Sequence, residues 1–111
     1  MSVDQRNVID AIGTDKQSGA VRLSIFDHLA WDEPLQHLEI LQNKINDYFG
    51  FIQSGQIFKV YPATKGKKLG IDVYFKFSPP EGDISRFLNK AKEIAGKLGV
   101  SFAYGSLPKV G

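Results

Sequence analysis

The chain has 111 residues, 42% of them hydrophobic and 23% charged, which is typical of one folded domain and unlike disordered or membrane-spanning chains. It has no cysteine, which excludes disulfides, thiol nucleophiles and iron–sulfur clusters and removes the thiolate ligands of most structural zinc sites. The net charge is +2, but residues 1–55 hold eight acids and four bases, whereas the rest of the chain holds four acids and ten bases.

The N-terminal part of the chain predicts a hairpin of two strands. Residues 8–12 and 20–26 are rich in apolar and β-branched side chains, and they flank the turn-forming sequence GTDKQSG. The second run alternates apolar and polar side chains: Val21, Arg22, Leu23, Ser24 and Ile25. This alternation is typical of a strand with one buried face.

A long amphipathic helix is predicted next. Asp32 can cap its first turn, Pro34 stands where its missing N–H does no harm, and Ser54 and Gly55 end it. The apolar stripe occupies a sector of about 140° on a helical wheel. Its members are Leu35, Leu38, Leu41, Ile45, Tyr48, Phe49 and Ile52.

Three further strands and a second helix follow. Residues 57–61 and 71–77 alternate apolar and polar side chains, so we expect two strands joined by a basic loop. A helix is predicted from an Asp83 cap to Leu98, and the last strand at residues 100–104. Gly99 suits the left-handed conformation that ends many helices.

The predicted order is therefore β-β-α-β-β-α-β, an α+β two-layer sandwich. We expect one five-stranded, mostly antiparallel sheet with two helices on one face. From Val21 onward the order is that of the ferredoxin-like split motif, and a variant of that topology is possible, because the N-terminal hairpin competes with the last strand for one edge. Residues 1–7 and 106–111 are predicted tails, and residues 8–105 a single domain.

Three segments carry a resemblance to a family of short bacterial proteins. They are VIDAIG at residues 8–13, LSIFDHLAW at 23–31 and HLEILQNKIN at 37–46. The sequence resembles this uncharacterised family from Val8 onward. The resemblance implies a bacterial origin and a single domain, but it implies no activity and transfers no functional residue.

The sequence offers few groups for catalysis. It has two histidines, no cysteine and no Gly-x-Ser-x-Gly elbow, so we assign no catalytic residue, no metal site and no cofactor. One alternative is a small-molecule-binding protein or enzyme with a site near Asp27, His28 and Asp32. Against it, Asp27 and His28 are neighbours in a strand and so point to opposite faces. We expect His37 to be an exposed helix residue.

A second alternative is nucleic-acid binding through the lysine-rich C-terminal half. Its cations include Lys59, Lys65, Lys67, Lys68, Lys76, Arg86, Lys90, Lys92 and Lys97. Phe58, Tyr61 and Tyr74 would stack on bases if they emerged on an open sheet face. However, these cations are nearly all lysine, and the aromatic RNP1 pattern is absent, so nucleic acid is the less favoured partner.

The favoured function is a non-enzymatic protein-interaction module. Ile40 and Phe51 fall outside the apolar stripe, His37 lies near Phe51 on the wheel, and Trp31 precedes the helix. Exposed apolar and tryptophan side chains are typical of interfaces. We therefore expect self-association as a homodimer, or an adaptor- or immunity-like role with a protein partner. No apolar run is long enough to span a membrane, and a cytoplasmic protein is expected.

Overall fold

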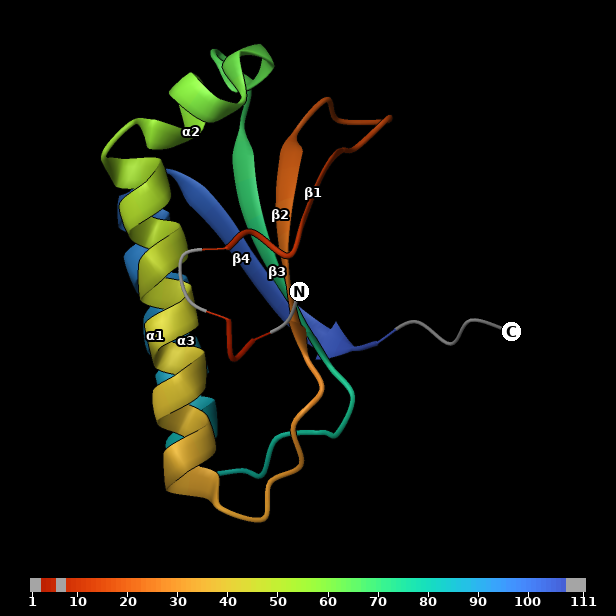
Figure 1. The fold of residues 1–111 in the computed structure, drawn as a ribbon, viewed down its shortest axis with the longest axis vertical. Coiled ribbons are helices and arrows are strands. Elements are labelled where there is room, and N and C mark those ends of the chain that lie inside the picture. The colour runs from red at the N-terminus through yellow and green to blue at the C-terminus, as the bar shows by residue number, and fades with distance from the viewer. Residues whose placement is uncertain (1–2, 6–7, 108–111) are drawn as a thin grey trace.

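The structure is a computed structural model that describes residues 3–5 and 8–107. Its elements are β1 (Ala11–Thr14), β2 (Val21–Asp27), α1 (Pro34–Gln53), α2 (Gln56–Val60), the 3-10 helix η1 (Pro62–Thr64), β3 (Leu69–Phe75), α3 (Asp83–Lys97) and β4 (Val100–Ser106). The strands form one sheet in the order β1-β2-β3-β4. Figure 1 shows α1 in front of α3, with both helices on the same side of this sheet, and the two helices are in contact. The predicted α+β fold with helices on one face is therefore confirmed.

The predicted five-stranded, mostly antiparallel sheet is wrong. Residues 57–61 lie in and just after α2, not in a strand, so the described chain has four strands and three α-helices. β1 pairs with β2 in antiparallel fashion, but β2 with β3 and β3 with β4 are parallel. The ferredoxin-like order is not adopted, because β4 lies at the edge beside β3 and far from β1.

The parallel pairs follow from the crossovers. The chain passes from β2 through α1, α2 and η1 to β3, and from β3 through α3 to β4. Each crossover connection leads to the next strand in the sheet, and both connections advance in the same direction. Because such connections are almost always right-handed, the helices of both lie on the same face of the sheet. The sheet therefore has no point at which strand order reverses, the usual place for a ligand crevice in parallel sheets.

The core lies between this sheet and the helices. Inward side chains of β2 and β3 alternate as predicted, including Leu23, Ile25, Ile71 and Val73, all with 0% exposure. On α1 the buried residues are His37, Leu41, Lys44, Ile45, Tyr48, Phe49 and Ile52. The buried sector is thus rotated by about 40° from the predicted apolar stripe. It takes in His37 and Lys44, and it leaves Leu35 75% exposed.

The two long helices begin without the predicted side-chain caps. Glu33, not Asp32, is the N-cap residue of α1, and Gly82 is that of α3, where Asp83 becomes the first helical residue. Neither cap residue makes a side-chain hydrogen bond to the helix. Pro34 does occupy the first turn of α1, where a missing N–H is harmless.

In the described part of the chain, the outer face of the sheet carries no helix (Figure 1). Cross-strand pairing aligns Gly13, Arg22, Gly70 and Ser101 in one row and Ala11, Ser24, Asp72 and Ala103 in the next. The Arg22 guanidinium bonds both Asp72 oxygens, at 2.8 and 2.5 Å, and donates to Ser101 Oγ at 2.8 Å. It lies over Gly70, where a Cβ would stand 2.4 Å from its Nη1. Strands β2, β3 and β4 are therefore linked by one side chain.

Candidate functional site

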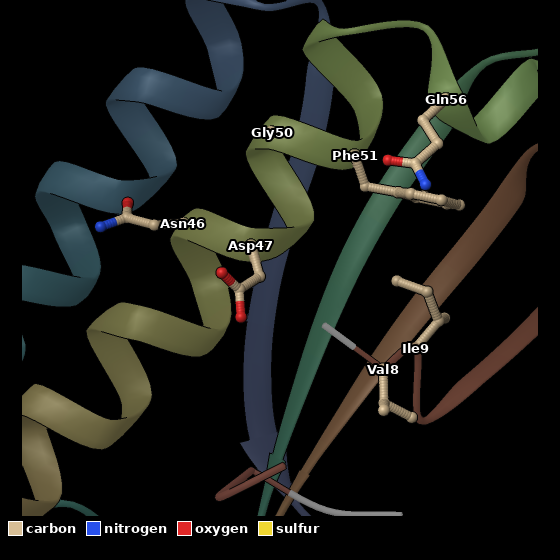
Figure 2. Close-up of a pocket in the computed structure, with 7 residues that line it drawn as sticks. All are labelled: Val8, Ile9, Asn46, Asp47, Gly50, Phe51 and Gln56. Atoms are coloured by element: carbon tan, nitrogen blue, oxygen red, sulfur yellow. The ribbon is translucent and has the colours of Figure 1, made fainter. Parts of the chain in front are cut away.

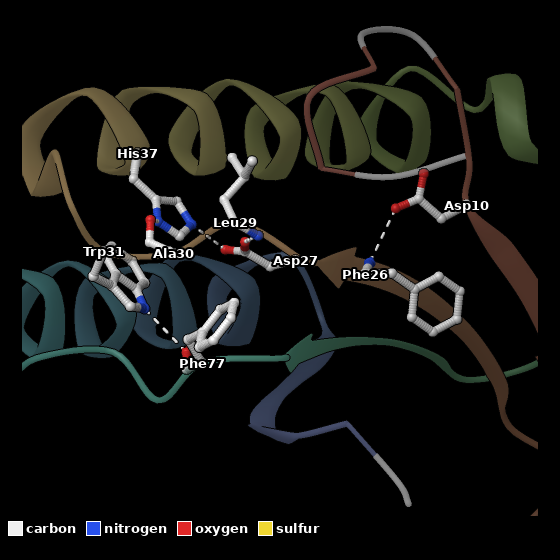
Figure 3. Close-up of polar contacts among 8 residues, drawn as sticks. All are labelled: Asp10, Phe26, Asp27, Leu29, Ala30, Trp31, His37 and Phe77. Carbon is white, nitrogen blue, oxygen red and sulfur yellow. Dashed lines mark hydrogen bonds and ion pairs between the residues drawn. The ribbon is translucent and has the colours of Figure 1, made fainter. Parts of the chain in front are cut away.

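A buried aspartate–histidine pair lies where β2 ends and α1 begins. His37 Nε2 is 2.5 Å from Asp27 Oδ2, and the two side chains are 3% and 0% exposed. The second ring nitrogen, Nδ1, is 3.1 Å from the carbonyl oxygen of Ala30. Figure 3 shows the imidazole held between these two acceptors. The prediction that His37 is an exposed helix residue is wrong.

The hydrogen bonds define what this pair can do. A carbonyl oxygen only accepts, so Nδ1 of His37 donates its proton to Ala30. One further proton lies between Asp27 and Nε2, on the carboxyl or on the ring. Because both ring nitrogens are engaged, neither is free to bind a metal or to take a proton from a substrate. The pair therefore fastens the first turn of α1 to the end of β2.

Burial raises the pKa of the Asp27 carboxyl above its ordinary value. The hydrogen bond and charge of His37 oppose this rise, as does the N–H of Leu29, which donates to Asp27 Oδ1 at 3.1 Å. The indole of Trp31 covers the imidazole, with ring centroids 3.6 Å apart and planes 17° from parallel. Its Nε1–H donates to the carbonyl oxygen of Phe77 at 3.0 Å, which closes this end of the core.

The residues of the alternative ligand site do not converge. Asp27 is turned towards His37, whereas His28 and Asp32 are exposed. Asp32 lines a hollow of about 310 Å³ with Glu33 and His37, but the ring nitrogens of His37 are already bonded. Within residues 3–5 and 8–107, no three His, Asp or Glu side chains are grouped so that they could hold a metal ion.

A second buried polar cluster joins α1 to the N-terminal segment. The ammonium of Lys44 has 0% exposure and lies 2.8 Å from Asp10 Oδ1, 2.7 Å from the Gln5 carbonyl oxygen and 2.6 Å from that of Val8. The ammonium thus donates hydrogen bonds to two backbone carbonyl groups and forms an ion pair with the Asp10 carboxylate. Asp10 Oδ2 in turn accepts the N–H of Phe26 at 3.0 Å, so the cluster reaches β2 (Figure 3).

Tyr48 completes this cluster. Its hydroxyl donates to the Ser24 carbonyl oxygen at 2.6 Å and accepts the N–H of Asp10 at 2.9 Å. Burial raises the pKa of this hydroxyl, which keeps it protonated and able to donate. The apolar stripe predicts Tyr48 in the core, but it does not predict the roles of Asp10 and Lys44. The available signal was Lys44 itself, one helical turn from both Leu41 and Tyr48 on the buried stripe.

The four residues of the predicted interaction surface lie in different surroundings. His37 is buried, and Trp31, Ile40 and Phe51 are half-buried and pack against the core. Ile40 lines the hollow beside Asp32, whereas Phe51 lines another, of about 410 Å³, with Val8 and Ile9. Figure 2 shows Phe51 directed towards these two N-terminal side chains.

The free edge of β4 is the longest uncovered strand edge in the described chain. β4 has seven residues, VSFAYGS, and none is charged or proline. Leu107 N–H donates to the Phe75 carbonyl oxygen at 2.9 Å, and strand alternation then turns residues 101, 103 and 105 towards β3 as well. The backbone N–H and C=O groups of Val100, Phe102, Tyr104 and Ser106 therefore point away from the sheet.

The aromatic residues proposed for base stacking do not share a surface. Phe58 lies in α2 and Tyr61 follows it, on the helical side of the fold. Tyr74 emerges on the outer sheet face and stacks on Phe26, with ring centroids 5.9 Å apart. A platform of three rings for nucleic-acid bases is therefore absent from the described part of the chain.

Comparison with known proteins gives a family but no activity. Residues 1–107 match a family of unknown function, DUF6572. The chain belongs to this family. No curated protein matches the sequence, and no solved structure matches it either. The predicted membership of an uncharacterised family is thus confirmed. None of the described helices combines the length and the apolar character needed to cross a membrane.

Proposed function

We propose that this protein is a non-enzymatic interaction module that self-associates through the free edge of β4. The observation that carries the proposal is the uncharged seven-residue edge with four outward N–H and four outward C=O groups. Strand edges in natural proteins are usually shortened, charged, interrupted by proline or covered, because an open edge pairs with other chains. β4 has none of the first three protections.

A second copy is the partner that this edge fits best. Two-fold symmetry with antiparallel strands places Ala103 opposite its own copy, Phe102 opposite Tyr104 and Val100 opposite Ser106. All eight outward groups of each strand are then paired. No like charges meet across the axis, since the strand has no charge. The Tyr104 ring, 43% exposed in the monomer, would gain an aromatic neighbour.

The buried polar groups support a role without catalysis. The buried polar side chains form hydrogen bonds or ion pairs with groups inside the fold. They are Asp27, His37, Asp10 and Lys44. They thus serve as internal attachments between α1, β2 and the N-terminal segment. The free edge of β4, in contrast, faces outward and can be reached by other molecules.

The test is the solution mass of three proteins measured by light scattering. Wild-type protein is expected at about twice its monomer mass of 12.3 kDa. Ala103→Lys places two ammonium groups opposite each other at the symmetry axis and should give a monomer. Ala11→Lys alters the same cross-strand row at the opposite edge of the sheet and should remain a dimer. A monomeric wild type, or a dimeric Ala103→Lys variant, would refute the proposal.

A further inference from the structure

A basic hollow lies at the end of the molecule where α1 and α3 end and β3 and β4 begin. Its volume is about 630 Å³. The lining residues are Ile52, Gln53, Phe58, Gly66, Lys67, Lys68, Leu69, Lys97, Leu98, Gly99 and Val100. Three of them are lysines and none is acidic. We propose that this basic hollow binds an acidic peptide segment of a partner protein that also carries apolar side chains.

All charged side chains that line the basic hollow are positive. Lys67 and Lys68 lie in the loop before β3, and Lys97 lies in the last turn of α3. Lys97 also complements the negative end of its helix dipole. Each helix C-terminus contributes about half a negative charge, so two helix ends cancel about one of the three lysine charges. The basic hollow therefore keeps a net positive potential.

The acids of the fold lie mostly elsewhere. Asp32 and Glu33 precede α1, and Glu81 and Asp83 stand at the start of α3. These starts lie at the lower end in Figure 1, opposite the turn between α3 and β4. These four acids and the three lysines of the basic hollow thus lie at opposite ends of the two long helices. Such a separation orients an approaching acidic partner towards the basic hollow.

The floor of the basic hollow selects the kind of partner. It is mostly aliphatic, with half-buried Leu98 beside Ile52, Leu69 and Val100, and its single ring is Phe58. Surfaces that bind nucleic acid stack several bases on aromatic side chains and are rich in arginine. This site has lysines and one ring. In an acidic segment with aliphatic side chains, the carboxylates would pair with the lysines at the rim of the basic hollow, and the aliphatic side chains would cover its apolar floor.

Fluorescence anisotropy with three labelled probes tests the inference. The probes are a short peptide of alternating glutamate and leucine, a peptide of the same length and charge with serine in place of leucine, and an oligothymidylate. The leucine peptide is expected to bind about tenfold more tightly than the serine peptide, because only it covers the apolar floor. Equal binding of the two peptides, or tighter binding of the oligothymidylate, would overturn the proposal.

Two charge-reversal variants locate the binding. Lys67→Glu with Lys97→Glu changes the rim of the basic hollow and should weaken binding of the leucine peptide about tenfold or more. Lys90→Glu with Lys92→Glu changes the net charge by the same amount on exposed positions of α3 outside the hollow, and it should leave the affinity nearly unchanged. Equal weakening by both variants would show diffuse attraction and overturn the proposal. All four substitutions are at exposed residues, so both variants should fold.

Discussion

The buried Asp27–His37 pair allows a sharp test of what holds α1 in place. Replacing His37 with leucine removes the hydrogen-bond partner of Asp27 Oδ2 and leaves a carboxyl of 0% exposure facing an apolar side chain. Breaking a fully buried pair in this way costs about 3–5 kcal/mol of unfolding free energy. Asp27→Asn is the matched control. Its oxygen can still accept the Leu29 N–H, and its amide can donate to Nε2 of a neutral His37, so we expect a cost of about 1 kcal/mol or less.

The pH dependence separates an electrostatic cost from a packing cost. Because burial raises the pKa of Asp27 above 3.8, the folded protein holds this proton to a higher pH than the unfolded chain. The resulting loss of unfolding free energy is absent below pH 3.8 and grows as the pH rises towards the pKa of Asp27 in the folded state. His37 lowers the pKa of Asp27 in the folded protein, so His37→Leu raises this pKa further. The pH range over which stability is lost then extends to higher pH. Relative to wild type at the same pH, His37→Leu should therefore regain stability as the pH is lowered, and Asp27→Asn should not.

Urea unfolding between about pH 4 and pH 8 measures both effects. If His37→Leu is equally destabilised relative to wild type at every pH, the cost is a packing defect and the electrostatic reasoning fails. If Asp27→Asn at neutral pH is as unstable as His37→Leu, the hydrogen-bond exchange proposed for the asparagine does not occur.

Two further predictions concern other polar contacts. Lys44→Met leaves Asp10 buried and unpaired and should lower the unfolding free energy by about 3–5 kcal/mol in urea titration; adding Asp10→Asn should recover part of this loss. Gly70→Ala places a methyl group 2.4–2.5 Å from Arg22 and Ser101 atoms and should cost about 1–3 kcal/mol by thermal unfolding. The same substitution in an Arg22→Ala background should cost clearly less, and an unchanged cost would contradict the packing argument.

The fold was predictable wherever a periodic pattern was long. The stripe of α3, the alternation of β2 and the start of β4 follow from the sequence with bounds within a few residues. Residues 57–61 were not predictable, because five residues fit both a period of 2 and a period of 3.6. This one short segment changes the whole sheet. As a strand it would make an antiparallel hairpin with its successor, whereas as α2 it extends the crossover that makes β2 and β3 parallel.

The buried polar pairs were less predictable because their partners are distant in sequence. Asp27 and His37 are separated by a turn whose path no local pattern fixes, and Asp10 meets Lys44 only after the N-terminal segment folds over α1. Charged side chains are almost never fully buried unless paired, so apolar spacing alone gave no reason to place Lys44 in the core. The position of Lys44 within the Leu41–Tyr48 stripe was the exception that pointed inward.

These polar pairs also determine how α1 is rotated on the sheet. Its apolar residues alone cover a sector wide enough to allow several rotations, including one that buries Leu35. Turning the helix by about 40° towards that arrangement would carry His37 and Lys44 to the border of the buried sector and away from Asp27 and Asp10. Asp27 and Asp10 would then stay buried without His37 and Lys44. The free-energy cost would exceed what burying one leucine side chain gains. The charged residues therefore select one rotation, and the exposure of Leu35 is its consequence.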